Sequence, residues 1–181
     1  MFKKIVFGLL GAIVLFLGYA STKDSQFRYE RSGVINASAD KIFPFISNFK
    51  NGLLWSPYEM KDPKMKRNYI GTDGQVGAIE EFDGNMEAGS GKLEILKVVP
   101  NELVQIRLLM TKPMAADHTV EYKLTPEGDA TRMTWAMYGD GGFVGKVMTT
   151  LIDCEKMVAG DMEVGIRNLK TVVENQVAAA K

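Results

Sequence analysis

The sequence predicts an α+β domain in which a long C-terminal helix lies on a curved antiparallel sheet. Two patterns carry this prediction. Polar and apolar residues alternate through the middle of the chain, as in half-buried strands, and apolar residues near its end recur in steps of three and four, as in an amphipathic helix. At 181 residues, of which 46% are hydrophobic, the chain is about one domain long and can bury a core.

The N-terminal segment is the clearest local signal. Lys3 and Lys4 precede an uninterrupted run of apolar and weakly polar residues at 5–20, which is typical of a targeting sequence. Its length of about 24 Å as a helix favours cleavage, whereas Ser21 and Thr22 can sit at the interface and favour an anchor. We therefore expect residues 1–20 to be a signal peptide or a single-pass membrane anchor. The rest of the chain is expected on the extracytoplasmic side, periplasmic or at the cell surface, either anchored or secreted.

The balance of charges excludes a general affinity for polyanions. Lys and Arg together number 22, as do Asp and Glu, so no nucleic-acid partner is expected. Cys154 is the only cysteine, so no intramolecular disulfide can form, and we interpret it as a packing residue. The oligomeric state is not indicated by any pattern in the sequence.

The first half of the domain combines a strand with short helical segments. Residues 28–37 are predicted to form a strand, after which Ser38 or Asp40 can cap a helix that Pro44 keeps short or bent. The next stretch, at 53–65, contains two prolines and fits neither a whole helix nor a whole strand.

Consecutive hairpins and one helix are predicted for the second half. The candidate strands are 77–84, 91–99, 102–112, 117–125 and 131–138. A single long helix is expected from residue 143 to about 179. Its apolar stripe comprises Val147, Leu151, Cys154, Val158, Met162, Ile166, Leu169 and Val173. Gly160 and Gly165 in this helix suggest either a close approach of a strand or ligand or simply easier packing.

Period two assigns the inner faces of three strands. In residues 117–125 the inner face is predicted to carry His118, Val120, Tyr122 and Leu124. The same rule groups Met133, Trp135 and Met137 in the following strand, and Val104, Ile106, Leu108 and Met110 in the preceding one.

Six blocks follow one another along the domain: RSGVINASADKIFPFISNF, LLWSPYEMKDPKM, GQVGAIEEFDGN, GSGKLEIL, VPNELVQIRL and TRMTWAMYGD. Their order and spacing resemble the polyketide cyclase/dehydrase-like branch of the START-like (SRPBCC) superfamily. The resemblance implies a helix-grip fold over residues 28–178, in which about seven antiparallel strands grip the C-terminal helix around a deep apolar cavity. The family shares no catalytic set, so the resemblance assigns no catalytic residue.

The resemblance also implies a ligand-binding site. Trp55, Pro57 and Tyr58 are expected at the rim of the cavity mouth, with Lys61, Lys64, Lys66 and Arg67 on its polar outside. The alternative is that Trp55 plugs the core beneath a loop. The residues expected to contact a ligand are Trp55, Tyr58, Phe82, Ile106, Leu108, Val120, Tyr122, Met133, Trp135, Met137, Val158 and Met162.

Two polar residues are candidates for catalysis. An inward Phe82 would send Glu80 inward too, where burial would raise the pKa of its carboxyl, and His118 is the other inward polar group. No metal is expected, because His118 and Cys154 are the only histidine and cysteine and stand far apart. No cofactor is expected either, since GDGGFVGK at 139–146 lacks the residues of a phosphate-binding loop.

Three functions remain open on the sequence. The first is an exported or membrane-tethered domain that binds a hydrophobic small molecule, such as a lipid or isoprenoid. The second is a cyclase- or dehydratase-type enzyme that acts on a cavity-bound substrate through Glu80 or His118. The third is an envelope interaction module whose cavity is filled by its own side chains.

Overall fold

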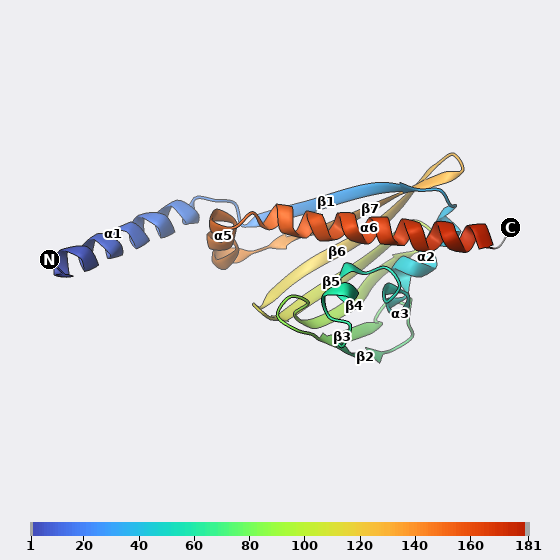
Figure 1. Cartoon of the computed structure of the whole chain (residues 1–181), viewed down its shortest axis with the longest axis horizontal. Helices are drawn as coiled ribbons and strands as arrows, with labels where there is room; N and C mark the ends of the chain where they lie inside the picture. The colour runs from blue at the N-terminus through green and yellow to red at the C-terminus, as the bar shows by residue number, and fades with distance from the viewer. Residues whose placement is uncertain (1, 180–181) are drawn as a thin grey trace.

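A seven-stranded antiparallel sheet forms the body of the protein in the computed structural model, which describes residues 2–179 (Figure 1). Its strand order is β1-β7-β6-β5-β4-β3-β2. The strands are β1 (Gln26–Ile35), β2 (Lys66–Ile70), β3 (Ile79–Asp83), β4 (Ser90–Val99), β5 (Leu103–Lys112), β6 (Ala116–Glu127) and β7 (Ala130–Asp140). The predicted meander is confirmed, with β1 added beside β7.

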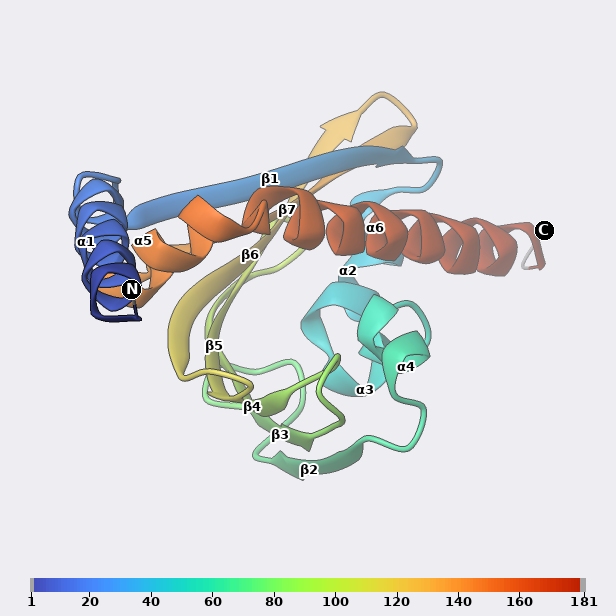
Figure 2. The same cartoon turned by 60° about the vertical axis from the view of Figure 1, so that its left-hand side comes forward.

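The helices lie on the concave side of this sheet or beyond its end. They are α1 (Phe2–Ser21), α2 (Ala39–Ser47), α3 (Phe49–Gly52), α4 (Pro57–Lys61), α5 (Gly142–Leu151) and α6 (Cys154–Ala179). Figure 2 shows the sheet curling beneath α6, with α2, α3 and α4 on the open side. The predicted helix-grip fold is therefore confirmed. Its core between sheet and α6 includes Ile35, Ile95, Met133, Met162, Leu169 and Val173.

The residue pattern did not predict strand β2. Its sequence KRNYI is short and half polar, and it follows a proline-containing segment, so it lacks the apolar alternation of the other strands. It pairs with β3 at the edge of the sheet, where Arg67 lies opposite Phe82 and Tyr69 opposite Glu80. Only Arg67 and Tyr69 of β2 are half-buried, so the strand presents one narrow inner face.

The predicted long C-terminal helix is confirmed as α6, but its predicted start at residue 143 is wrong, because the chain breaks between α5 and α6. Ile152 adopts an extended conformation at the end of α5. Asp153 then accepts a hydrogen bond from the backbone N–H of Lys156 at 2.9 Å, as an N-cap residue does. The apolar stripe runs through the break, yet its first half leaves Leu151 63% exposed while the second half is buried against the sheet.

Helix α1 stands apart from the domain. Within residues 2–179 it is the one helix long and apolar enough to cross a membrane, and it projects away from the sheet (Figure 1). Residues 22–25 connect it directly to β1. Its last turn packs near α5, where Lys146 Nζ donates a hydrogen bond to the Ser21 carbonyl at 3.2 Å.

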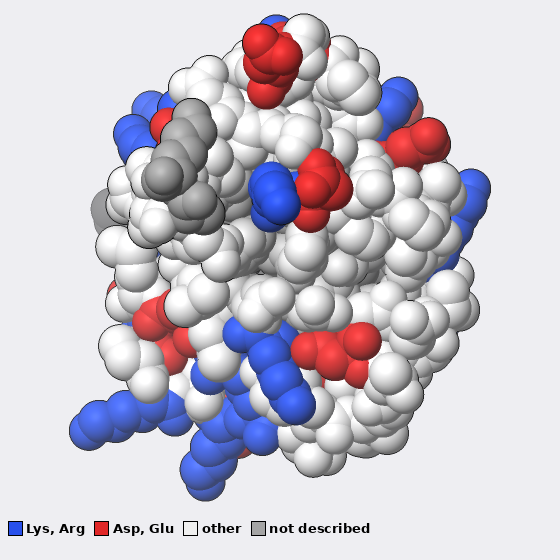
Figure 3. All heavy atoms as spheres, turned by 90° about the vertical axis from the view of Figure 1, so that its right-hand side faces the viewer, with Lys and Arg blue, Asp and Glu red and all other residues white. Residues whose placement is uncertain are grey.

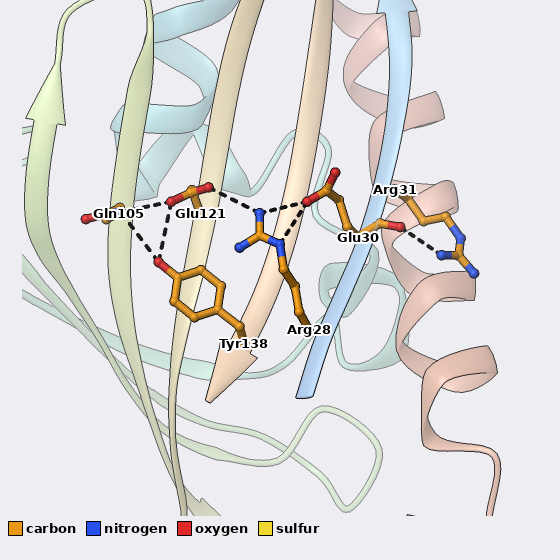
Figure 4. Close-up of polar contacts among 6 residues, drawn as sticks. All are labelled: Arg28, Glu30, Arg31, Gln105, Glu121 and Tyr138. Carbon is orange, nitrogen blue, oxygen red and sulfur yellow. Dashed lines mark hydrogen bonds and ion pairs between the residues drawn. The ribbon is translucent and has the colours of Figure 1, made fainter. Parts of the chain in front are cut away.

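The convex face of the sheet is polar and is bridged by side chains from four strands (Figure 4). Arg28 Nη2 donates to Glu30 at 2.7 Å and to Glu121 at 3.5 Å. Glu121 also accepts hydrogen bonds from Gln105 at 2.8 Å and from Tyr138 at 3.4 Å. The network joins β1, β5, β6 and β7, so an internal site has to lie on the opposite, concave face.

Candidate functional site

A cavity of about 370 Å³ lies between the concave face of the sheet, the α2–α4 segment and the first half of α6. This volume is in the range of small-molecule pockets, roughly 300–1,000 Å³. Eleven of the twelve residues expected to contact a ligand line it, and they come from α4, α6, four strands and the loop before α4. These are Trp55, Tyr58, Phe82, Ile106, Leu108, Val120, Tyr122, Trp135, Met137, Val158 and Met162.

Met133 is the exception. Its side chain is fully buried in the core, and the structure does not place it among the cavity-lining residues. It shares the inner face of β7 with Trp135 but pairs with Gly33 and Leu124, toward the end of the sheet where α6 packs closely on β1. An added Cβ at Gly33 would lie 2.6 Å from Ile166, which shows that no space remains there.

Trp55 is part of the floor of the cavity rather than its rim. It is 4% exposed, and its indole N–H donates to the Phe45 carbonyl at 2.8 Å. Its ring meets Tyr122 and Trp135 edge to face, with centroids 5.7 and 5.6 Å apart. The alternative interpretation, a plug beneath a loop, therefore describes Trp55 better. The irregular 53–65 stretch places this ring against the concave face of the sheet.

Helix α6 accommodates that aromatic floor through Gly165. A Cβ built on Gly165 would lie 2.5 Å from the Trp135 ring and 3.2 Å from Pro57. The close approach suggested by the sequence is therefore real at Gly165 and involves a strand side chain. At Gly160 an added Cβ meets nothing within 4 Å, so that glycine has no packing role.

Glu80 points into the cavity, as period two predicted from Phe82. It is 8% exposed, and its Oε1 lies 3.2 Å from Nε of Arg67, whose other nitrogens bond Glu59 and the Met65 carbonyl. Burial raises the pKa of Glu80 to about 7. The Arg67 guanidinium lowers this pKa, but the nearby carboxylates of Glu59 and Asp73 oppose its effect. At neutral pH this carboxyl can therefore both donate and accept a hydrogen bond.

His118 lies far from Glu80 along the same row of the sheet. Glu80 pairs with Leu93, Leu93 with Leu108, and Leu108 with His118, so three strand spacings of about 4.8 Å separate the two polar groups. Burial lowers the pKa of His118, whose ring packs edge-on against Phe27 with centroids 4.7 Å apart. The two candidates therefore stand on opposite sides of the cavity and do not form an acid–base pair.

Two tyrosines add polar groups to the wall. Tyr58 and Tyr122 line the cavity, and burial raises the pKa of both phenols. Glu80 is among the charged groups that raise the pKa of Tyr122 further, and Tyr58 contributes as well. The three side chains thus add polar groups to a wall that is mainly aliphatic and aromatic.

A salt bridge closes one side of the cavity. Lys61 Nζ of α4 lies 2.6 Å from Asp161 Oδ2 of α6, and both residues line the cavity. The lining residues Glu87, Pro113 and Met157 are exposed, which places the mouth between the β3–β4 loop, the β5–β6 loop and the start of α6.

The sequence did not identify the polar contacts around the mouth and beneath Glu80. Arg67 was expected on the polar outside, yet its side chain is only 12% exposed because β2 turns it inward opposite Phe82. Lys61 was expected there too and is instead held by Asp161, whereas Lys64 and Lys66 are exposed as expected. The one available signal was the alternation of Arg67 and Tyr69, which marks an inner face.

Comparisons with known proteins agree with this architecture. Residues 26–174 match the family described as polyketide cyclase / dehydrase and lipid transport. No curated protein matches the sequence.

Several solved structures share the fold. A protein of unknown function from Staphylococcus aureus is 10% identical, with a TM-score of 0.63 over 86% of this chain and 98% of that chain. Norcoclaurine synthase from Thalictrum flavum, in complex with dopamine and hydroxybenzaldehyde, is 18% identical, with a TM-score of 0.58 over 83% and 87%. The major latex-like protein 151 from Panax ginseng is 11% identical, with a TM-score of 0.56 over 81% and 97%.

At such identities these structures show the fold alone, whereas the family match spans most of the chain. The chain therefore belongs to the polyketide cyclase/dehydrase and lipid-transport family of the START-like superfamily.

Proposed function

We propose that this protein is a membrane-tethered binding domain for a hydrophobic small molecule that carries one hydrogen-bonding group. The observation that carries the proposal is the cavity of about 370 Å³, whose wall is mainly aliphatic and aromatic. The family description, which includes lipid transport, supports the same ligand class. The membrane-length helix α1 supports a tether.

The polar region of the wall narrows the ligand chemistry. Glu80, Tyr58 and Tyr122 offer hydrogen bonds inside the cavity, and Arg67 lies behind Glu80 already paired with it and with Glu59. Lys61, which also lines the cavity, is paired with Asp161, so neither Lys61 nor Arg67 is presented unpaired to the ligand. This arrangement favours a neutral hydroxyl or carbonyl group, as in an isoprenoid alcohol or quinone, over a phosphate or carboxylate.

The test is native mass spectrometry of the full chain released from detergent micelles, followed by analysis of the released lipid. We expect a defined apolar adduct at near-equal stoichiometry. Val120→Trp should fill the cavity and remove the adduct, while Thr119→Trp, the neighbour on the other face of β6, should retain it. Leu108→Phe provides a milder filling variant if Val120→Trp does not fold. An empty wild-type cavity would contradict the proposal.

Catalysis is the second candidate function, and the pKa of Glu80 near 7 is the observation that favours it. A buried carboxyl that is half protonated at neutral pH can act as a general acid or base on a bound substrate. On incubation with the ligand identified by native mass spectrometry, the wild type should then convert it to a product, whereas Glu80→Gln should leave it intact. Equal behaviour of the two proteins would remove this carboxyl from any mechanism.

The third function, an interaction module with a filled cavity, has the least support. The cavity retains open volume in spite of the aromatic floor that Trp55, Tyr122 and Trp135 form.

A further inference from the structure

The cavity mouth and α1 lie at the same end of the sheet. The antiparallel register places Gln26 at the start of β1 opposite Asp140 at the end of β7. Continuing across the sheet, Gly139 pairs with His118 near the start of β6, Met110 with Ala116, and Asp83 with Ser90. The β3–β4 and β5–β6 loops that border the mouth therefore lie at the same end of the sheet as the point where α1 joins β1, across the strands that separate them (Figures 1 and 2).

This end of the molecule carries several exposed apolar side chains, three of them on one helix. Helix α5 has no buried residue, and Phe143, Val144 and Leu151 on it are 51%, 59% and 63% exposed. Met86 in the β3–β4 loop and Met157 at the mouth are 73% and 64% exposed. We call this surface the docking face; it comprises Met86, Met114, Phe143, Val144, Leu151 and Met157.

Helix α5, which carries half of the docking face, is continuous with α1. Helix α5 packs against α1, Lys146 donates to the Ser21 carbonyl, and the Gly141 N–H donates to the Ser25 carbonyl at 2.9 Å. Because α1 exposes apolar side chains along nearly its whole length, an environment that covers α1 reaches α5 as well. The apolar helix α1 is thus joined at its C-terminal end to a second helix with exposed apolar side chains, α5.

Charge near the docking face does not select an anionic surface. Lys112, Lys146 and Lys156 are accompanied there by the acidic residues Asp83, Glu87, Asp153 and Glu155, so basic residues do not outnumber acidic ones. The opposite end of the molecule also displays charged side chains of both signs (Figure 3). Apolar insertion, rather than electrostatic attraction, is therefore the mode of contact that this end supports.

We propose that the docking face lies in the interfacial layer of the same bilayer that holds α1, with the cavity mouth open toward the lipid. The proposal rests on the tether in the proposed function and goes beyond it by giving the ligand a route. A hydrophobic molecule then passes between bilayer and cavity past Met157 and Met114 without crossing water. An in-plane helix inserts its apolar face about 5–10 Å into the headgroup region, which suits α5.

Depth-dependent quenching of the full chain in phosphatidylcholine nanodiscs tests this placement. In a Cys154→Ser background, an environment-sensitive dye is attached to Phe143→Cys on α5, to Leu10→Cys on α1, or to Val76→Cys. Val76 is 62% exposed in the β2–β3 loop, at the far end of the sheet, and so matches the residues of the docking face in exposure. Lipids brominated near the headgroup should quench the dye at 143 about threefold more than the dye at 76.

Each outcome separates the docking face from the tether. Quenching at 10 with equal, weak quenching at 143 and 76 overturns the docking face and leaves the tether intact. Quenching at 143 without quenching at 10 retains the docking face and removes the tether. Protection at 143 that appears only when discs hold two chains assigns the face to a second copy and overturns the proposal.

A second measurement examines the route itself. A pyrene-labelled fatty alcohol in the disc should enter the cavity several-fold more slowly in a Phe143→Ser, Leu151→Ser variant than in a Val76→Ser control. Because α5 has no buried residue, these substitutions leave the core unchanged. Equal entry rates in both variants would overturn the proposed route.

Discussion

Glu80 shows how one side chain can be buried and still be available to a ligand. The cavity removes water from its carboxyl, while Arg67 and Glu59 keep the surroundings close to electrically neutral. The inner position of Glu80 follows from the sequence, because alternation with Phe82 fixes the face. Its partner Arg67 does not, because the polar strand β2 carries too little apolar alternation to be recognised.

We predict that Glu80 makes the stability of the protein depend on pH. Its pKa rises from an ordinary value of 4.5 to about 7 on folding, so the folded state binds the proton more tightly than the unfolded state. The free energy of unfolding should therefore be highest below pH 4.5 and fall by about 3 kcal/mol as pH rises through 7 to about 8. Chemical denaturation across this range, in the wild type and Glu80→Gln, measures the difference.

Glu81→Gln is the matched control, since Glu81 is the neighbouring carboxylate on the exposed face of β3. If the wild type and Glu80→Gln lost stability in parallel between pH 4.5 and 7, the raised pKa would be wrong.

At the scale of elements, α6 acts as one wall of the cavity and as a packing partner for the aromatic floor. Its buried half follows the predicted stripe through Met162, Ile166, Leu169 and Val173. The break before α6 was not predicted, because the apolar steps of three and four continue through Leu151 and Cys154. Periodicity indicates which face of a helix is apolar, but it does not indicate whether the helix axis is continuous. Asp153, an N-cap residue inside the apolar stripe, was the available signal of the break.

The two glycines of α6 should respond to alanine in opposite directions. Gly165→Ala places a methyl group against Trp135 and should lower the free energy of unfolding by about 1–3 kcal/mol. Gly160→Ala meets open space and should raise it by up to about 1 kcal/mol through helix propensity. Urea unfolding of both variants in one detergent provides the comparison, and a loss of stability in Gly160→Ala equal to that of Gly165→Ala would refute this account of the floor.

At the scale of the whole molecule, the sheet, α6 and the α2–α4 segment form three sides of one container. The sheet and the gripping helix follow from the strand and helix patterns together with the resemblance. The side of the cavity that α4 forms could not be predicted from the sequence. Lys61 and Asp161, which join α4 to α6, are separated by 100 residues, and such a long-range pair leaves no local pattern.

We predict that this pair controls ligand exchange. Lys61→Met or Asp161→Asn should accelerate release of a pyrene-labelled fatty alcohol about two- to fivefold, the range expected for a partly exposed ion pair. The double variant should be no faster than either single one, because each removes the same contact. Lys64→Met, at an exposed position of the same segment, serves as the control. Additive acceleration in the double variant would show that the pair does not act as a unit.

Only residues 22–25 separate the end of α1 from the start of β1. Even fully extended, such a connection spans about 14 Å, so the start of β1 in a domain tethered by α1 stays within about 14 Å of the end of that helix. Its docking face then meets the membrane at an effective concentration in the millimolar range. An intrinsic affinity too weak to recruit a free domain is therefore sufficient, and contact can be made and broken quickly enough for the cavity to exchange its contents.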